Sequence, residues 1–135
     1  MKSRARHHQY PFALYAAGFS AQEPVFDQIA NDTSSPQRIA ANAPIMAFWI
    51  LFYGAEAGDH IDTEILDPEG RVYIQNQTIQ EKKKIRAMRY IGTRTQTKPL
   101  HAGTYAGRAT LWRLLPGGQT ITRSISSSVV VGNGN

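Results

Sequence analysis

The feature of this sequence that most constrains its fold is a series of short segments in which apolar and polar residues alternate. In residues 60–66, for example, Ile61, Thr63 and Ile65 alternate with more polar neighbours. Successive side chains of a strand point to opposite faces, so the pattern indicates a strand with one face in a core. Similar segments recur along the chain between turn signals such as Asp67–Gly70. These features predict an all-β, immunoglobulin-like antiparallel β-sandwich of about seven strands, with no disulfide because the chain has no cysteine.

The predicted strands divide the chain into one domain with short flanking segments. We expect strands at residues 12–19, 46–53, 60–66, 72–77, 85–92, 105–115 and 121–131. The intervening residues 22–42 are polar, with a single helical turn expected at 25–30. We therefore predict a sandwich domain over residues 11–131, a linker or added segment at 1–10 and a flexible tail at 132–135.

The segment 46–53 is apolar on both faces. Trp49 and Leu51 alternate with Phe48 and Ile50, whereas a strand with one solvated face would alternate with polar residues. We therefore expect a central strand whose outer face is covered. The alternative is a self-associating structural module, a weak homo-oligomer, in which a second copy covers this face. The apolar run is about half of the roughly 20 residues needed to cross a bilayer, so we predict no transmembrane segment.

A tyrosine near the start of a late strand supports the immunoglobulin-like prediction. Tyr105 follows Gly103 and Thr104, which matches the tyrosine corner of such sandwiches, and its hydroxyl should bond to backbone a few residues upstream. An antibody domain has a cysteine two residues later, where this chain has Gly107. We expect Tyr105, Trp49 and Trp112 to be structural, with the two tryptophans in the core or at its rim.

Basic residues gather around one predicted strand. The chain has 15 Lys and Arg against 10 Asp and Glu, a net charge of +5, which favours anionic partners. The candidate binding residues are Lys82, Lys83, Lys84, Arg86, Arg89 and Tyr90, the last as a ring for stacking. Basic residues also protect an exposed edge strand from aggregation, and this is the alternative interpretation. We consider nucleic acid an unsupported partner.

Motifs for chemistry are sparse. The sequence contains no nucleophile elbow, Walker loop, H-E-x-x-H motif or dinucleotide fingerprint. His60, Asp62 and Glu64 share one face of a predicted strand, so a small metal-dependent enzyme is an alternative, although a solvated polar face is the preferred explanation. We predict no catalytic residue, no metal and no cofactor.

Several short segments together resemble a known family. They lie at residues 16–19, 47–50, 53–59, 67–70 and 103–113. In them the chain resembles the non-catalytic C-terminal β-sandwich domain of alphaproteobacterial lysostaphin-type (LytM-type) peptidoglycan metallopeptidases. The zinc-binding H-x-x-x-D and H-x-H motifs of that family's peptidase domain are absent. The nearest approach, His60 to Glu64, has glutamate in place of aspartate.

The resemblance implies an accessory role rather than an activity. It implies a domain of the periplasm or cell envelope that positions a peptidoglycan hydrolase or contacts cell wall or a protein partner. The implied partners are its own or an associated peptidase domain, and peptidoglycan or another anionic envelope polymer. None of the family's catalytic residues can be assigned to this chain.

Overall fold

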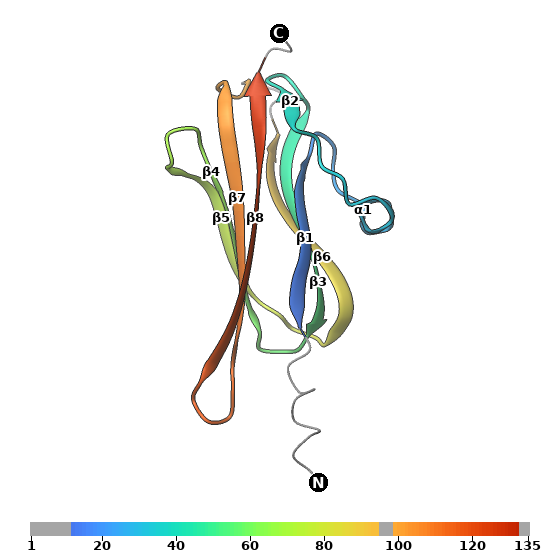
Figure 1. Ribbon diagram of the computed structural model, residues 1–135, viewed down its shortest axis with the longest axis vertical. Coiled ribbons are helices and arrows are strands. Elements are labelled where there is room, and N and C mark those ends of the chain that lie inside the picture. The colour runs from blue at the N-terminus through green and yellow to red at the C-terminus, as the bar shows by residue number, and fades with distance from the viewer. Residues whose placement is uncertain (1–11, 95–98, 133–135) are drawn as a thin grey trace.

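A computed structural model of the chain describes residues 12–94 and 99–132, which form two β-sheets packed face to face (Figure 1). The smaller sheet has the strand order β1-β3-β6, and both pairs in it are antiparallel. Its strands are β1 (Ala13–Ser20), β3 (Ile45–Ala55) and β6 (Lys84–Arg94). The predicted linker at residues 1–10 lies outside the described residues.

The larger sheet has five strands in the order β2-β8-β7-β4-β5. They are β2 (Arg38–Ala40), β4 (His60–Leu66), β5 (Val72–Ile79), β7 (Gly103–Leu114) and β8 (Thr120–Gly132). One short helix, α1 (Phe26–Asn31), lies in the β1–β2 connection, close to the predicted helical turn. No helix in the described part of the chain is long and apolar enough to cross a membrane.

The predicted fold class is confirmed, with two differences in detail. The described residues form an immunoglobulin-like β-sandwich of eight strands rather than about seven, and β2 pairs with β8 in parallel. Only Ile39 of the three β2 residues is buried, so this strand is too short to reveal an alternating pattern. Gly132, predicted to begin the tail, instead ends β8, and its carbonyl accepts a hydrogen bond from the Ala41 N–H at 3.0 Å.

Strand β3 is central in its sheet and buried on both faces, as predicted. Its inward residues, including Phe48, join the core between the sheets. On the outer face Trp49 and Leu51 are fully buried. The β1–β2 connection covers Trp49: a Cβ at Gly18 would lie 2.5 Å from the indole and 2.7 Å from Ser35. Trp49 and Leu51 are therefore not available to a second molecule, whereas Tyr53 further along the same face is exposed.

The tyrosine corner is also confirmed. The Tyr105 hydroxyl donates to the His101 carbonyl at 3.0 Å, and burial raises the pKa of the phenol. At Gly107, a Cβ would lie 2.3–2.5 Å from three atoms of the Phe48 ring. The Phe48 ring of β3 therefore packs directly on the backbone of β7, at the position where an antibody domain carries a cysteine of its inter-sheet disulfide.

Candidate functional site

The predicted basic residues lie at one edge of the smaller sheet. Lys82 and Lys83 precede β6, Lys84 begins it and Arg86 lies within it; all four side chains are exposed. Among the described residues, no carboxylate lies within 4.0 Å of any of these cationic groups. We refer to these four residues as the basic edge.

The other two predicted binding residues make contacts within the domain. Arg89 is partly buried, and its guanidinium donates to the Gln80 Oε1 at 2.9 Å. The Tyr90 hydroxyl donates to Glu23 at 2.8 Å, and this hydrogen bond raises the pKa of the phenol. Arg86 and Arg89 point to opposite faces of β6, as their spacing predicts. The structure thus separates Arg89 from the basic edge and ties Tyr90 to the β1–α1 connection.

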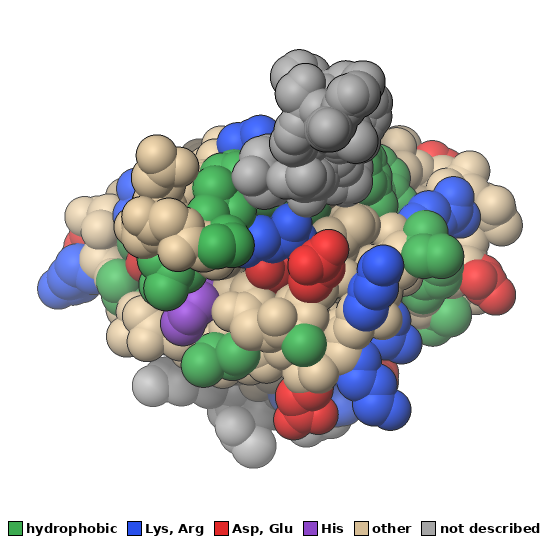
Figure 2. Space-filling view, turned by 90° about the horizontal axis from the view of Figure 1, so that it is seen from below, with side chains coloured by type: hydrophobic (Ala, Val, Ile, Leu, Met, Phe, Trp, Pro, Cys, Tyr) green, Lys and Arg blue, Asp and Glu red, His purple; other side chains and the backbone are tan. Residues whose placement is uncertain are grey.

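The surface charge is mixed at the end of the molecule that Figure 2 shows. Lys and Arg side chains lie there in several groups, with acidic side chains between them (Figure 2). The net charge of +5 is therefore not spread as one continuous positive field over this end. At this end of the molecule, a contact with an anionic partner would have to use a local cluster of cations.

The proposed metal ligands share one face of β4 but do not converge. The His60 ring stacks on Trp112, with centroids 3.7 Å apart and planes 6° from parallel. Glu64 accepts hydrogen bonds from Arg108, the neighbouring residue on β7. The described residues contain no group of three His, Cys, Asp or Glu side chains that could hold a metal ion. The Trp112 side chain is partly exposed on the outer face of the larger sheet, whereas Trp49 is buried.

A polar groove runs over the outer face of the larger sheet, and no local pattern in the sequence indicates it. Its volume is about 580 Å³, within the range of ligand sites. The groove is lined by Asp62, Thr63, Glu64, Gln75, Asn76, Gln77, Arg108, Ala109, Thr110, Ser124, Ile125 and Ser126. These residues come from β4, β5, β7 and β8.

The strand registers arrange the outward side chains of the groove in cross-strand rows. One row is Gln75, Glu64, Arg108 and Ser126, and the next is Gln77, Asp62, Thr110 and Ser124. In the second row the Thr110 and Ser124 hydroxyl oxygens are 3.4 Å apart. Asp62 forms no side-chain hydrogen bond or ion pair with any described residue, so its carboxylate is open to a ligand.

A buried ion pair fixes the start of β4. Arg113 donates to both oxygens of Asp59, at 2.7 and 2.8 Å, and to the Gly54 carbonyl at 2.9 Å. The hydrogen bond with Asp59 raises the pKa of the guanidinium. Asp59 also accepts from the Glu56 N–H at 2.8 Å. This pair holds the turn that leads into His60 and hence the placement of Asp62.

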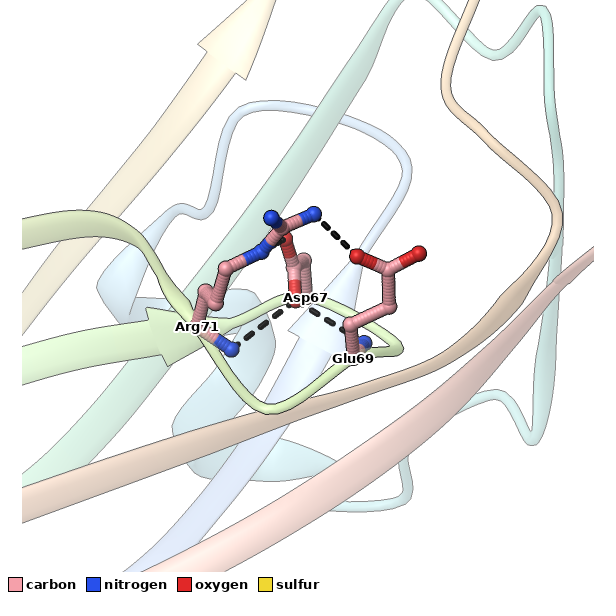
Figure 3. Close-up of polar contacts among 3 residues, drawn as sticks. All are labelled: Asp67, Glu69 and Arg71. Atoms are coloured by element: carbon pink, nitrogen blue, oxygen red, sulfur yellow. Dashed lines mark hydrogen bonds and ion pairs between the residues drawn. The ribbon is translucent and has the colours of Figure 1, made fainter.

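The other end of β4 is held by a tight turn (Figure 3). Asp67 accepts from the backbone N–H groups of Glu69 and Arg71, each at 2.9 Å, and the Arg71 side chain pairs with Glu69 (Figure 3). The hydrogen bond from the Arg71 backbone is the main cause that lowers the pKa of the Asp67 carboxyl. The turn sets the β4–β5 register and therefore one side of the polar groove.

Comparisons with known proteins assign no family to this chain. No protein-family model matches the chain, and no curated protein matches it. Among solved structures it is similar to the CARDB domain of a Pyrococcus furiosus protein, solved in complex with di-metal ions. The identity is 12%, the TM-score is 0.42, and the match covers 87% of this chain and 91% of that domain. A likeness of this extent transfers neither ligand nor activity to this chain.

Proposed function

We propose that this domain is a non-catalytic accessory module of a cell-envelope peptidoglycan hydrolase, and that the basic edge contacts anionic cell-wall polymer. The observation that carries the proposal is the basic edge itself, four exposed cations without a carboxylate partner among the described residues. Four neighbouring cations raise the local potential, attract a polyanion and make its binding sensitive to salt. The association with a hydrolase rests on the family resemblance.

Edge protection does not account for all four residues. Lys84 and Arg86 lie on β6, an edge strand, where charge discourages pairing with another sheet. Lys82 and Lys83 precede the strand, where there are no unpaired strand backbone groups that charge would need to protect. A run of cations that continues beyond the strand supports a contact with an extended anion.

The enzyme alternative has weaker support. A metal-dependent reaction through His60, Asp62 and Glu64 would require the three side chains to meet. Stacking on Trp112 occupies His60, and Arg108 occupies Glu64. Binding by the basic edge requires no change in the contacts of His60 and Glu64.

The test is co-sedimentation with insoluble peptidoglycan sacculi at about 50 and 300 mM salt, across which screening of exposed charges increases strongly. The test variant changes Lys82, Lys83, Lys84 and Arg86 to glutamine. The matched control changes four exposed arginines elsewhere to glutamine, so that both variants have a net charge of +1. These control positions are Arg38, Arg71, Arg94 and Arg123.

We expect native protein and the control variant to sediment with sacculi at low salt and less at high salt, and the basic-edge variant to remain in solution. Equal sedimentation of the two variants would show that net charge alone is responsible and would overturn the assignment to the basic edge. Absence of sedimentation for the native protein would overturn direct wall contact.

A further inference from the structure

From the polar groove we infer a second binding surface, which takes an uncharged polysaccharide chain. This inference goes beyond the proposed function, because it concerns the opposite sheet and a different chemistry. It stands even if the basic edge serves only solubility. It rests on the rows of outward side chains and on the charges that they do and do not carry.

The lining of the groove extends across four neighbouring strands. Four strands contribute outward residues at successive positions, and neighbouring strands of a sheet lie about 4.8 Å apart. Each row therefore extends roughly 14 Å, and the next row lies about 6.8 Å further along the strands. An elongated ligand can contact several side chains in a row, which a compact ligand cannot.

The row of Gln77, Asp62, Thr110 and Ser124 carries hydrogen-bonding groups that suit the hydroxyl groups of a ligand. Asp62 offers only acceptors, Gln77 offers a donor and an acceptor, and the hydroxyls of Thr110 and Ser124 can serve as either. A sugar hydroxyl also donates and accepts, so it can satisfy each of these groups in turn. An alternating set of this kind fits a hydroxyl-rich chain better than a ligand with donors alone.

The charges in the groove disfavour a polyanion. Arg108 is the one cation of the lining, and Glu64 neutralises it. Asp62 adds a negative charge without a partner among the described residues. The groove therefore carries a slight negative charge on a protein of net charge +5. Uncharged hydroxyl donors complement this surface, whereas carboxylated or phosphorylated polymers do not.

The neighbouring row supplies an aromatic surface. His60 and Trp112 pair across β4 and β7, directly beyond Asp62 and Thr110, and their rings stack. Trp112 is partly exposed, so it presents apolar ring surface next to hydrogen-bonding groups. A sugar ring has both C–H and O–H groups and can use both.

The experiment measures binding of two uncharged probes, a hexamer of N-acetylglucosamine and cellohexaose, by isothermal titration calorimetry. The test variant combines Asp62→Asn with Thr110→Val, which keeps side-chain shape. The matched control combines Asp27→Asn with Thr104→Val, two exposed positions outside the groove. Circular dichroism and a thermal melt show that both variants remain folded. Polygalacturonate serves as the anionic comparison.

We expect the native protein to bind at least one neutral hexamer, with an affinity that changes less than twofold between 50 and 300 mM salt. The test variant should bind about tenfold more weakly, since Thr110→Val removes a hydroxyl and Asp62→Asn replaces one acceptor oxygen with a donor. The control variant and the basic-edge variant should bind as the native protein does. Which hexamer binds separates an amino-sugar polymer from a plain glucan.

Three results would overturn the inference. The first is no binding of either hexamer at millimolar concentration, and the second is equal binding by the test and control variants. The third is binding of polygalacturonate alone. Because the basic-edge variant retains the groove, its loss of sacculus binding together with intact hexamer binding would separate the two proposals.

Discussion

Replacement of Gly107 by alanine tests whether the contact of Phe48 with the β7 backbone determines how closely the two sheets pack. The new Cβ would lie 2.3–2.5 Å from three ring atoms, against an optimum of about 3.5–4.0 Å. Overpacking of this kind costs about 1–3 kcal/mol. Alanine also restricts the unfolded chain more than glycine does, which stabilises the fold by about 0.4–1 kcal/mol. This gain applies because Gly107 does not have a positive φ. We expect a net loss of about 1–2 kcal/mol.

The assay is equilibrium unfolding in urea, with Gly117→Ala as the control. A Cβ at Gly117 meets no atom within 4 Å, and its φ is not positive. The control should therefore be as stable as the native protein or slightly more stable. The midpoint of Gly107→Ala should fall with an unchanged slope, as expected for a change in stability alone.

A second background makes the test specific to the ring. Phe48→Leu removes part of the ring and costs stability itself, but it leaves room for a Cβ at position 107. In this background Gly107→Ala should cost at least about 1 kcal/mol less than it does in the native chain. An equal cost in both backgrounds, or no cost in the native chain, would refute the assignment of this contact.

Two further predictions concern the groups that hold the ends of β4. Asp59→Asn should destabilise the domain by about 3–5 kcal/mol in urea unfolding, because it leaves the buried Arg113 cation unpaired; Arg108→Gln, at an exposed pair, should cost less than about 1 kcal/mol. A similar cost for both changes would contradict the first prediction. For Asp67, the folded pKa lies below the unfolded value of about 3.9, so its contribution to stability is present above about pH 4 and is lost as pH falls through the folded pKa. Asp67→Asn should reduce the acid sensitivity of the melting temperature, and an unchanged pH profile would contradict this.

The larger features of the fold follow from local patterns. Apolar and alternating segments predicted seven of the strands, and the double-faced segment around Trp49 indicated a central strand before any pairing was known. Tyr105 indicated the immunoglobulin-like class because its role depends on one short local hydrogen bond. Strand β2 could not be predicted, since three residues with one buried side chain carry no period.

The contacts of individual side chains were less predictable than the positions of the strands. Arg89 and Tyr90 each have a residue type that suits binding, but Gln80 and Glu23 engage them within the domain. These partners lie up to 67 positions away in the sequence. A local run of basic and aromatic residues therefore shows which groups are near an edge, and not which of them remain free.

The polar groove also could not be predicted from any local segment, yet its geometry is well defined. Its residues are ordinary polar positions of four strands, and only the register brings Asp62 beside Thr110 and Thr110 beside Ser124. A slip of one residue would turn Ile61 and Ile65 outward and bury Asp62 in the core. The same burial that stabilises the sandwich thus fixes the rows of the groove. The arrangement of its hydrogen-bonding groups is as strongly specified as the core, although no segment of the sequence reveals it alone.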